Sequence, residues 1–323
     1  MNQVSSPLIQ ATLLCKRFKV GKKCLNALRD INISIGKGET LGLVGESGCG
    51  KSTMGKVLLR LEEPTSGNIY FQKKKVNSFS PSEMRTYRRS AQMIYQDPYA
   101  SLNPRMSIKD IVGEGLDIHK LASSAIREET ILEALAEVGL GREVIERYPH
   151  EFSGGQRQRI VIARAMVMKP QFIVCDEPLS SLDMCTQKQI MTLLLRFKQE
   201  KQLTYLFISH DLHAVREISD RVAVMYLGKI VEQATNDQLF STPLHPYTQA
   251  LLSAVPTMDP QKERDRLRII LKGELPSPFN PPTGCAFHPR CPVAMPICQK
   301  IDPCLKELES GHFVACHKFD EAD

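Results

Sequence analysis

Residues 45–53, Gly-Glu-Ser-Gly-Cys-Gly-Lys-Ser-Thr, constrain the fold of this 323-residue chain more than any other stretch. They fit the pattern G-x-x-x-x-G-K-[ST], a glycine-rich loop whose backbone amides wrap closely around phosphate. The flanks fit too, because residues 39–44 predict a short buried strand and residues 54–61 a helix with one apolar face. This order places an anion at the positive end of a helix. The stretch therefore predicts a nucleotide-phosphate site, and a glycine turn that only caps a helix is the weaker interpretation.

The loop residues have distinct expected roles toward ATP. The Lys51 ammonium would reach the β- and γ-phosphates, and the Ser52 hydroxyl would ligate Mg²⁺. The expected ATP-binding residues of the loop are Gly45, Glu46, Ser47, Gly48, Cys49, Gly50, Lys51, Ser52 and Thr53.

The composition is that of an ordinary globular protein, with 42% hydrophobic and 24% charged residues. No apolar run approaches the roughly 18 residues that span a bilayer. Residues 1–10 lack the basic-then-apolar pattern of a signal peptide, so we expect a cytoplasmic protein. The net charge of +6 is mild, and the basic clusters at 73–75 and 85–89 include only one aromatic residue, Tyr87. We expect these clusters to form a solvated surface, and we expect no binding of nucleic acid.

A second apolar strand delivers two adjacent carboxylates. Residues 172–175 are apolar, and Asp176 and Glu177 follow directly. We expect Asp176 to hold Mg²⁺ through water, and Glu177 to polarise the attacking water as a general base. An acidic pair can also simply end a strand, but the phosphate loop makes that the weaker interpretation.

Two further strands end in polar residues that suit the ligand edge of an open α/β sheet. Residues 91–95 lead to Gln96, and residues 204–209 lead to His210. Ligands bind beyond the carboxyl ends of parallel strands, so both side chains are candidates for the nucleotide site. A lone histidine after a strand is more often structural, but here we favour a contact with the γ-phosphate.

Between these strands, residues 107–149 show helical spacing, at 108–119 and 125–138, and predict a helical insertion. The insertion ends before an apolar helix over 160–168. Ser153 is a plausible N-cap of that helix, and Gly154 and Gly155 bare backbone amides at a second positive helix end.

Residues 7–38, upstream of the phosphate loop, predict antiparallel strands on either side of a basic turn at 21–23. Phe18 has polar neighbours just before that turn. It can stack on an adenine face, or it can be an ordinary strand aromatic.

Together, the motifs resemble the ATP-binding subunit of an ABC transporter over roughly residues 7–250. They stand in the family's order: the phosphate loop, Gln96, Ser153-Gly154-Gly155-Gln156, Asp176-Glu177 and His210. The Ser-Gly-Gly-Gln signature is specific to ABC ATPases. The resemblance implies an α/β fold of the ABC-type P-loop NTPase class, with a mixed-sheet core, an antiparallel β subdomain and a helical subdomain at about 97–165. We expect a nucleotide-binding domain over 1–250 and a small cysteine- and proline-rich C-terminal extension over 251–323.

The resemblance also implies a composite site, because such subunits pair head to tail and sandwich two ATP molecules. Gln96 would sense Mg²⁺ and the attacking water while facing the membrane subunits, and His210 would act as the γ-phosphate switch. Phe18 fills the adenine-stacking position. The signature Ser153, Gly154, Gly155 and Gln156 would serve the partner's ATP, and the D-loop, including Ser180 and Asp183, would cross the dimer.

The departures from the family pattern are small. Phe152 replaces the usual leucine before the signature, and Leu179 stands where threonine or valine is frequent. Neither removes a catalytic group, so we expect an active ATP hydrolase.

Segments outside the ATPase core are similar to the oligopeptide/dipeptide importer subfamily, and closest to its second ATPase subunit. They are Tyr99–Pro104, His245–Leu252 and Gly273–Pro278 continuing to Gly284 and Cys285. The resemblance implies a peripheral subunit on the cytoplasmic face of the membrane, with a sister ATPase, two transmembrane permeases and, indirectly, an extracytoplasmic substrate-binding protein. Nickel and glutathione importers share this architecture. A soluble ABC ATPase of translation or DNA repair is less favoured, because the chain has neither a second cassette nor a long coiled-coil insertion.

The end of the chain is rich in cysteine and proline. Five of the ten cysteines lie in the last 39 residues, and eight of the twenty prolines lie between Pro276 and Pro303. The prolines disfavour helices and strands, so this segment has little core of its own and needs a staple. In a reducing compartment the cysteines suggest metal rather than disulfides. Paired Cys-x2–4-Cys zinc knuckles are absent, and the wider spacing suits an iron–sulfur cluster better.

Members of the peptide-importer subfamily carry such a cysteine cluster, assigned as [4Fe–4S]. Their last cysteine follows a short apolar stretch near the end of the chain, like residues 313–315 here. The resemblance therefore implies Cys285, Cys291, Cys298 and Cys316 as ligands, with Cys304 as the alternative fourth. Zinc and no metal at all remain open alternatives.

Overall fold

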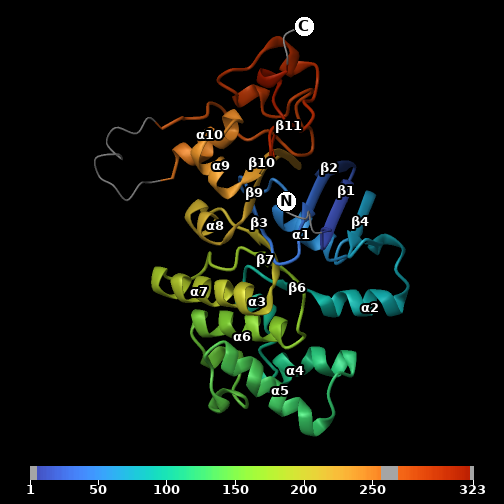
Figure 1. Cartoon of the computed structure of the whole chain (residues 1–323), viewed down its shortest axis with the longest axis vertical. Coiled ribbons are helices and arrows are strands. Elements are labelled where there is room, and N and C mark those ends of the chain that lie inside the picture. Colours follow the sequence, from blue (N-terminus) through green and yellow to red (C-terminus); the bar gives the residue numbers. More distant parts are fainter. Residues whose placement is uncertain (1–5, 256–267, 321–323) are drawn as a thin grey trace. The chain divides into compact units, whose positions relative to one another are not determined.

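The structure is a computed structural model that describes residues 6–255 and 268–320 (Figure 1). The chain forms two compact units, each built from separate stretches. The first unit comprises residues up to 9, 35–39 and 70–208, and the second comprises 10–34, 40–69 and 209 onward. The predicted absence of a signal peptide concerns residues 1–10, of which 1–5 lie outside the described ranges.

The first unit contains three parallel strands in the order β6-β7-β8: β6 (Ala91–Ile94), β7 (Phe172–Asp176) and β8 (Thr204–Ile208). Every residue of β7 and β8 is buried. Such continuously apolar strands are typical of a parallel sheet that is covered on both faces. The 18-residue helix α7 (Met184–Lys201) provides the crossover that two parallel strands require.

The same unit carries the helical segment that the sequence predicts. Three of its helices, α4, α5 and α6, pack on one another (Figure 1). The predicted helices at 108–119 and 125–138 are confirmed to within one residue. The four helices are α3 (Pro98–Ser101), α4 (Ile108–His119), α5 (Ser124–Glu137) and α6 (Gly154–Met166).

The basic cluster at 85–89 lies on a helix that the sequence analysis missed, α2 (Pro81–Ser90). Its start carries a clear signal, because Ser80 and Glu83 form a capping box and Pro81 occupies the first turn. Tyr87, expected on a solvated surface, is instead buried, with its ring centroid 5.1 Å from that of Phe71. The short strand β5 (Lys74–Lys75) precedes this helix and pairs with β4 (Ser66–Phe71).

In the second unit, β1 (Ile9–Val20) and β2 (Lys23–Ile35) are joined by a two-residue turn and lie in the order β2-β1-β4. These are the antiparallel strands that the sequence predicts around the basic turn. A second group of strands holds the phosphate loop. There β3 (Thr40–Val44) runs parallel to β9 (Arg221–Tyr226), and β9 pairs antiparallel with β10 (Lys229–Thr235).

The second unit also contains helices. They are α1 (Lys51–Leu58), α8 (Leu212–Ile218), α9 (Asn236–Ser241) and α10 (Pro246–Ser253). No helix of the described ranges is long and apolar enough to cross a membrane.

The C-terminal extension joins the second unit through a strand. Between Pro276 and Pro303 the described residues form only 3-10 turns, at His288–Arg290 and Pro296–Gln299, as the prolines predict. Two strands follow, β11 (Lys306–Glu309) and β12 (His312–Val314), and β12 pairs antiparallel with β10. The extension therefore adds to the sheet of its unit.

Its apolar anchor is Phe287, which is 1% exposed. The ring packs against Tyr226 and Tyr247, with centroids 5.2 and 5.4 Å away. His245 lies in the same cluster, and burial lowers its pKa to about 3, so its ring is neutral and Nδ1 accepts the N–H of Tyr247 at 3.0 Å. The extension, which we expected to have little core of its own, thus packs Phe287 into the core of the second unit.

Phe287→Ala should destabilise the protein by about 3–5 kcal/mol, because it removes a buried ring and leaves a cavity. The free energy of unfolding can be followed by urea denaturation and circular dichroism. Phe279→Ala is the matched control, because Phe279 is 39% exposed. Equal shifts in the two variants would contradict the role of Phe287 as an anchor.

Candidate nucleotide-binding site

The phosphate loop connects β3 to α1, and two of its glycines cannot be replaced without moving the backbone. Gly45 has φ of 152°, and a Cβ there would lie 2.2 Å from the carbonyl oxygen of Met225. Gly50 has φ of 109°, and a Cβ there would lie 2.4 Å from the carbonyl oxygen of Ala27. The loop is therefore pressed against two strands of its own unit, which explains its glycines.

Lys51 lies inside the loop and is 5% exposed. Its ammonium donates to the carbonyl of Gly45 at 2.7 Å and to that of Glu46 at 3.1 Å. These hydrogen bonds hold the ammonium inside the loop, and its contact with phosphate stays a prediction. Burial raises the pKa of the neighbouring Cys49 thiol, so Cys49 is a packed neutral thiol rather than a reactive one.

Two residues that hold the loop were missed by the sequence analysis. The Tyr247 hydroxyl accepts the backbone N–H of Glu46 at 2.9 Å, and the Arg290 guanidinium donates twice to the Glu46 carboxylate. Tyr247 belongs to a segment noted for its likeness to peptide importers, but nothing local indicates this contact. Arg290 lies 244 residues from Glu46, and no sequence signal connects them.

In the first unit, the structure brings together Gln96 and Glu177, which are 81 residues apart. The Gln96 Nε2 atom donates to a carboxylate oxygen of Glu177 at 2.9 Å. Asp176, the last residue of β7, is 5% exposed and directly precedes Glu177. Both carboxylates thus stand at the carboxyl end of β7, as predicted.

Glu177 has a left-handed backbone, with φ of 48°. Its N–H donates to the carbonyl of Ile208 at 2.9 Å, and the Ser180 hydroxyl donates to the Glu177 carbonyl at 3.1 Å. Such a conformation is unfavourable for a residue with a side chain, and it persists where the surroundings enforce it. These hydrogen bonds fix the backbone from which the predicted general base extends.

The signature residues begin α6. The Ser153 hydroxyl accepts the N–H of Gln156 at 3.3 Å, and the Gln156 side chain accepts the N–H of Ser153 at 3.1 Å. This reciprocal capping confirms Ser153 as the N-cap. The first helical amides, those of Gly154 and Gly155, belong to the positive end of the helix.

The D-loop lies beside the signature in the same unit. Asp183 caps α7 and accepts hydrogen bonds from the N–H and the hydroxyl of Thr186, at 3.0 and 2.6 Å. These hydrogen bonds lower the pKa of the Asp183 carboxyl. A Cβ on Gly155 would lie 2.4 Å from the methyl group of Thr186, so the start of α6 closely approaches the start of α7.

The remaining predicted residues belong to the second unit, with the phosphate loop. His210 is exposed in the connection from β8 to α8, next to Asp211, which caps α8 by accepting the N–H of His213. Phe18 is half-buried on β1, and the Lys16 ammonium lies 4.6 Å from its ring centroid.

All ten cysteines are free thiols. The pKa of Cys285 is raised to about 11, first by burial and then by the nearby thiols of Cys298, Cys316 and Cys291. Cys304, which is exposed, is not among the thiols that act on Cys285. Within the described ranges, no three His, Cys, Asp or Glu side chains come close enough to hold one metal ion.

Two family models match the chain. Residues 28–180 match "ABC transporter", and residues 231–298 match "Oligopeptide/dipeptide transporter, C-terminal region". The chain is 51% identical to the putative oligopeptide transport ATP-binding protein YkfD of Bacillus subtilis over 319 residues, which cover 98% of this chain and 97% of YkfD. It is 52% identical to the oligopeptide transport ATP-binding protein AppF of the same organism, with coverage of 93% and 91%. The chain belongs to the ATP-binding proteins of the ABC-type oligopeptide/dipeptide transporter family. The predicted family is confirmed.

Solved structures agree with this assignment. The ATP-binding cassette MJ0796, a dimer in a post-hydrolysis state bound to ADP and Pi, is similar with a TM-score of 0.65 and 29% identity, covering 71% of this chain and 98% of that one. CbiO1 from Clostridium perfringens, part of an ABC transporter complex, is similar with a TM-score of 0.65 and 27% identity, covering 74% and 92%. The predicted ABC-type P-loop NTPase fold and the prediction of an ABC ATPase are confirmed.

Gly155→Ala should destabilise this ABC ATPase by about 1–3 kcal/mol, because the new methyl group would overpack against Thr186. Thermal denaturation measures the loss. Gly154→Ala is the matched control, since the nearest atom to a Cβ there, on Leu182, is 3.8 Å away. A larger loss in Gly154→Ala than in Gly155→Ala would be inconsistent with the described approach of α6 to α7.

Proposed function

We propose that this chain hydrolyses ATP to energise import of oligopeptides or dipeptides through an ABC transporter. One observation carries the proposal: the likeness to oligopeptide transport ATP-binding proteins extends over nearly the full length, through both the ATPase core and the C-terminal region. The relatives with this likeness are named for oligopeptide or peptide transport, which favours peptides over nickel or glutathione.

ATP binding is assigned to the phosphate loop, with Phe18 against the adenine. The loop amides and the buried ammonium of Lys51 supply the positive charge that phosphate groups need. Ser52, Asp176 and Gln96 supply oxygen atoms, the ligands that Mg²⁺ prefers. When bound, Mg²⁺ neutralises charge that develops on the β- and γ-phosphate oxygens.

Glu177 is assigned as the general base and Gln96 as the residue that orients it. The Gln96 amide donates to a carboxylate oxygen of Glu177 and so fixes the direction in which that carboxylate accepts the proton of the attacking water. Deprotonation of that water prepares it to attack the γ-phosphorus, and His210 contacts the γ-phosphate.

A second subunit completes the ATP site in this proposal. The amides at the start of α6, with Ser153 and Gln156, serve the partner's ATP, and Ser180 and Asp183 form the D-loop between the two subunits. The capping box fixes the start of α6, so its positive end is available to an anion. We propose a sister ATPase as the partner, two transmembrane permeases, an indirect substrate-binding protein, and a peripheral position on the cytoplasmic face of the membrane.

A soluble ABC ATPase of translation or DNA repair is the second candidate, and it is disfavoured. The longest helix of the described ranges, α7, has 18 residues, so these ranges hold no long coiled-coil insertion. The matched relatives are also named for transport rather than for translation or repair.

Glu177→Gln should lower the rate of ATP hydrolysis at least about 100-fold, because the amide cannot accept the water proton. ATP binding should be retained. The measurement is phosphate release by the complex reconstituted with its permeases, together with uptake of labelled peptide. Glu129→Gln, a substitution of an exposed carboxylate in the same unit, is the control and should be without effect.

Unchanged hydrolysis in Glu177→Gln would exclude Glu177 as the base. Uptake of Ni²⁺ or glutathione in place of peptides by the wild-type complex would exclude the proposed substrate class. Recovery of the chain with ribosomes or DNA, and not with permeases, would exclude transport.

For the extension, we propose that Cys285, Cys291, Cys298 and Cys316 hold a [4Fe–4S] cluster. Two observations support this: the N–H of Cys285 donates to the carbonyl of Cys298 at 2.8 Å, and the thiols of Cys298, Cys316 and Cys291 raise the pKa of Cys285. The thiols do not meet at one point suited to a single ion, but in a cluster they need not, since each thiolate binds a different iron atom. A bound cluster would tie the proline-rich stretch to Cys316, which follows β12.

Anaerobically purified protein should therefore contain iron and inorganic sulfide and absorb visible light. Cys316→Ser should abolish the absorbance, because it removes one of the four ligands. The matched variant Cys304→Ser should keep it, since Cys304 is exposed and is not among the thiols that raise the pKa of Cys285. Loss of the cluster in Cys304→Ser with retention in Cys316→Ser would reverse the assignment of the fourth ligand, and iron-free, colourless wild-type protein would reject the cluster.

A further inference from the structure

The C-terminal extension reaches the phosphate loop through one side chain, Arg290. Its Nη1 atom donates to Oε2 of Glu46 at 2.7 Å, and its Nη2 atom donates to Oε1 at 2.9 Å. The Arg290 side chain is only 10% exposed, and the Glu46 side chain is 28% exposed. The hydrogen bond to Glu46 is the largest of the effects that raise the pKa of Arg290. A bidentate, largely shielded pair of this kind fixes direction as well as distance.

Glu46 is also held through its backbone. Its N–H donates to the Tyr247 hydroxyl, and Tyr247 is fully buried beside Tyr226, with ring centroids 4.8 Å apart. Burial raises the pKa of Tyr247, so the phenol remains neutral at physiological pH. Phe287, three residues before Arg290, packs into the same aromatic cluster. Both contacts to Glu46 therefore come from one rigid cluster that the extension helps to build.

Arg290 itself is held in a short turn between two cysteines. Its N–H donates to the carbonyl of Phe287 at 3.0 Å, and the N–H of Cys291 donates to the carbonyl of His288 at 3.3 Å. The N–H of Cys285 donates to the carbonyl of Cys298 at 2.8 Å. These hydrogen bonds fix the backbone of Arg290 within the extension.

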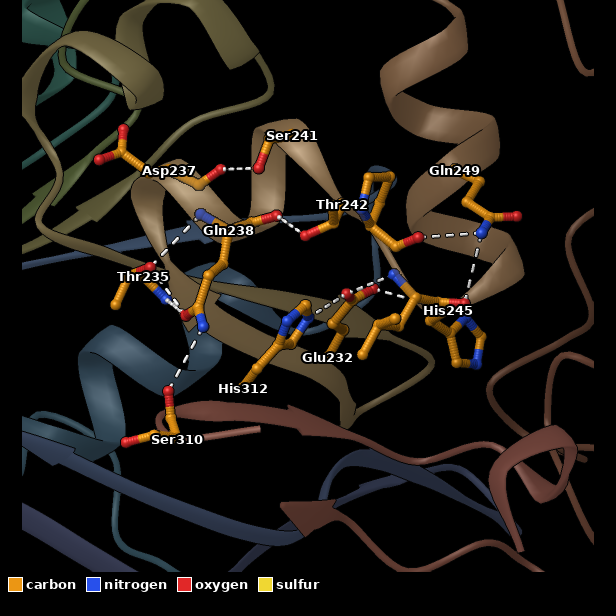
Figure 2. A network of polar contacts seen from close by, with 12 residues as sticks. Glu232, Thr235, Asp237, Gln238, Ser241, Thr242, His245, Gln249, Ser310 and His312 are labelled. Carbon is orange, nitrogen blue, oxygen red and sulfur yellow. Dashed lines mark hydrogen bonds and ion pairs between the residues drawn. The ribbon is translucent and has the colours of Figure 1, made fainter. Parts of the chain in front are cut away.

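The far end of the extension is tied to β10 of the same unit (Figure 2). The buried carboxylate of Glu232 contacts Nε2 of His312 at 2.8 Å and also accepts the N–H of His245 at 2.9 Å. The Gln238 side chain donates to the carbonyl of Ser310 at 3.3 Å. The extension is thus held to its unit on both sides of Arg290, by Phe287 and by β12. This fixes the direction from which the guanidinium meets Glu46.

A contact with Arg290 orders the phosphate loop before a nucleotide binds. Glu46 follows Gly45, and glycine has more backbone freedom to lose than any other residue. Ordering a loop costs conformational entropy. If the loop is already ordered by another contact, less of this cost is subtracted from the binding free energy of the nucleotide. Without Arg290, the Glu46 carboxylate would also lose its fixed direction.

We propose that Arg290 is a positioning residue that holds the phosphate loop in its nucleotide-binding conformation and so couples the C-terminal extension to ATP affinity. This inference rests on the proposed function, in which the loop binds ATP. The coupling runs in both directions, because linkage between two sites is reciprocal.

The test is Arg290→Ala in the full chain, compared with Asp302→Asn. Asp302 also joins the extension to the rest of its unit, through Arg29 at 3.3 Å and through Lys229, but it does not contact the phosphate loop. Calorimetric titration with Mg²⁺-ATP should show a roughly tenfold higher Kd for Arg290→Ala, within the usual range of coupling between sites. Asp302→Asn should bind like the wild type.

Steady-state hydrolysis by the reconstituted complex separates positioning from folding. Arg290→Ala should raise KM with kcat nearly unchanged, because the contact aids binding rather than the chemical step. A purely structural defect would instead lower the folded fraction, and so the apparent kcat, with KM unchanged. Arg290→Lys keeps the positive charge and the buried alkyl chain but loses the bidentate hydrogen bonds. Its KM should therefore lie between those of the wild type and of Arg290→Ala. This variant also serves if Arg290→Ala fails to fold.

Hydrogen exchange tests the reverse direction. Mg²⁺-ATP should slow exchange in residues 285–291 of the wild type and of Asp302→Asn, but not of Arg290→Ala. Wild-type Kd and KM in both Arg290 variants, or an equal loss in Asp302→Asn, would overturn the inference. A wild-type protein that does not bind ATP at all would overturn the proposed function instead.

Discussion

The close approach of the phosphate loop to the backbone of β9 organises the second unit. Gly45 leaves no room for a side chain against the carbonyl of Met225, so the loop and this strand touch backbone to backbone. The next residue, Tyr226, then falls into the aromatic cluster with Tyr247 and Phe287. From β9 the ladder continues to β10 and to β12 of the extension. A contact that only glycine permits therefore brings the phosphate loop against β9, the strand from which this ladder extends to β12.

Two local features shape the candidate site in the first unit. They are the capped starts of α6 and α7, and the left-handed backbone at the end of β7. Ser153 and Asp183 cap α6 and α7, and Gly155 allows these two starts to approach each other closely. Glu177 takes a left-handed backbone at the end of β7 and receives the hydrogen bond of Gln96. The hydrogen bond from Gln96 fixes the direction of the carboxylate that we propose as the general base.

Much of the fold could be predicted from the sequence because its signals are local. The apolar runs at 172–175 and 204–208 and the helical spacing at 108–119 correspond to observed elements. The capping of α6 by Ser153 was also predictable, since the cap and its partner are three residues apart. The helix α2 was missed although Ser80, Pro81 and Glu83 mark its start, because Tyr87 is its one buried residue and the helix therefore shows no apolar stripe.

The contacts that join distant parts of each unit could not be predicted in this way. Nothing in the residues around Arg290 indicates Glu46, and the burial of Tyr87 depends on Phe71 and Phe79, which precede its helix. The sequence by itself determined the phosphate loop, the carboxylate pair and the signature, because each is a short pattern with its own backbone geometry. Only the tertiary structure decided that the extension holds Glu46, because a salt bridge between residues 244 positions apart exists only after the sheet has set their distance.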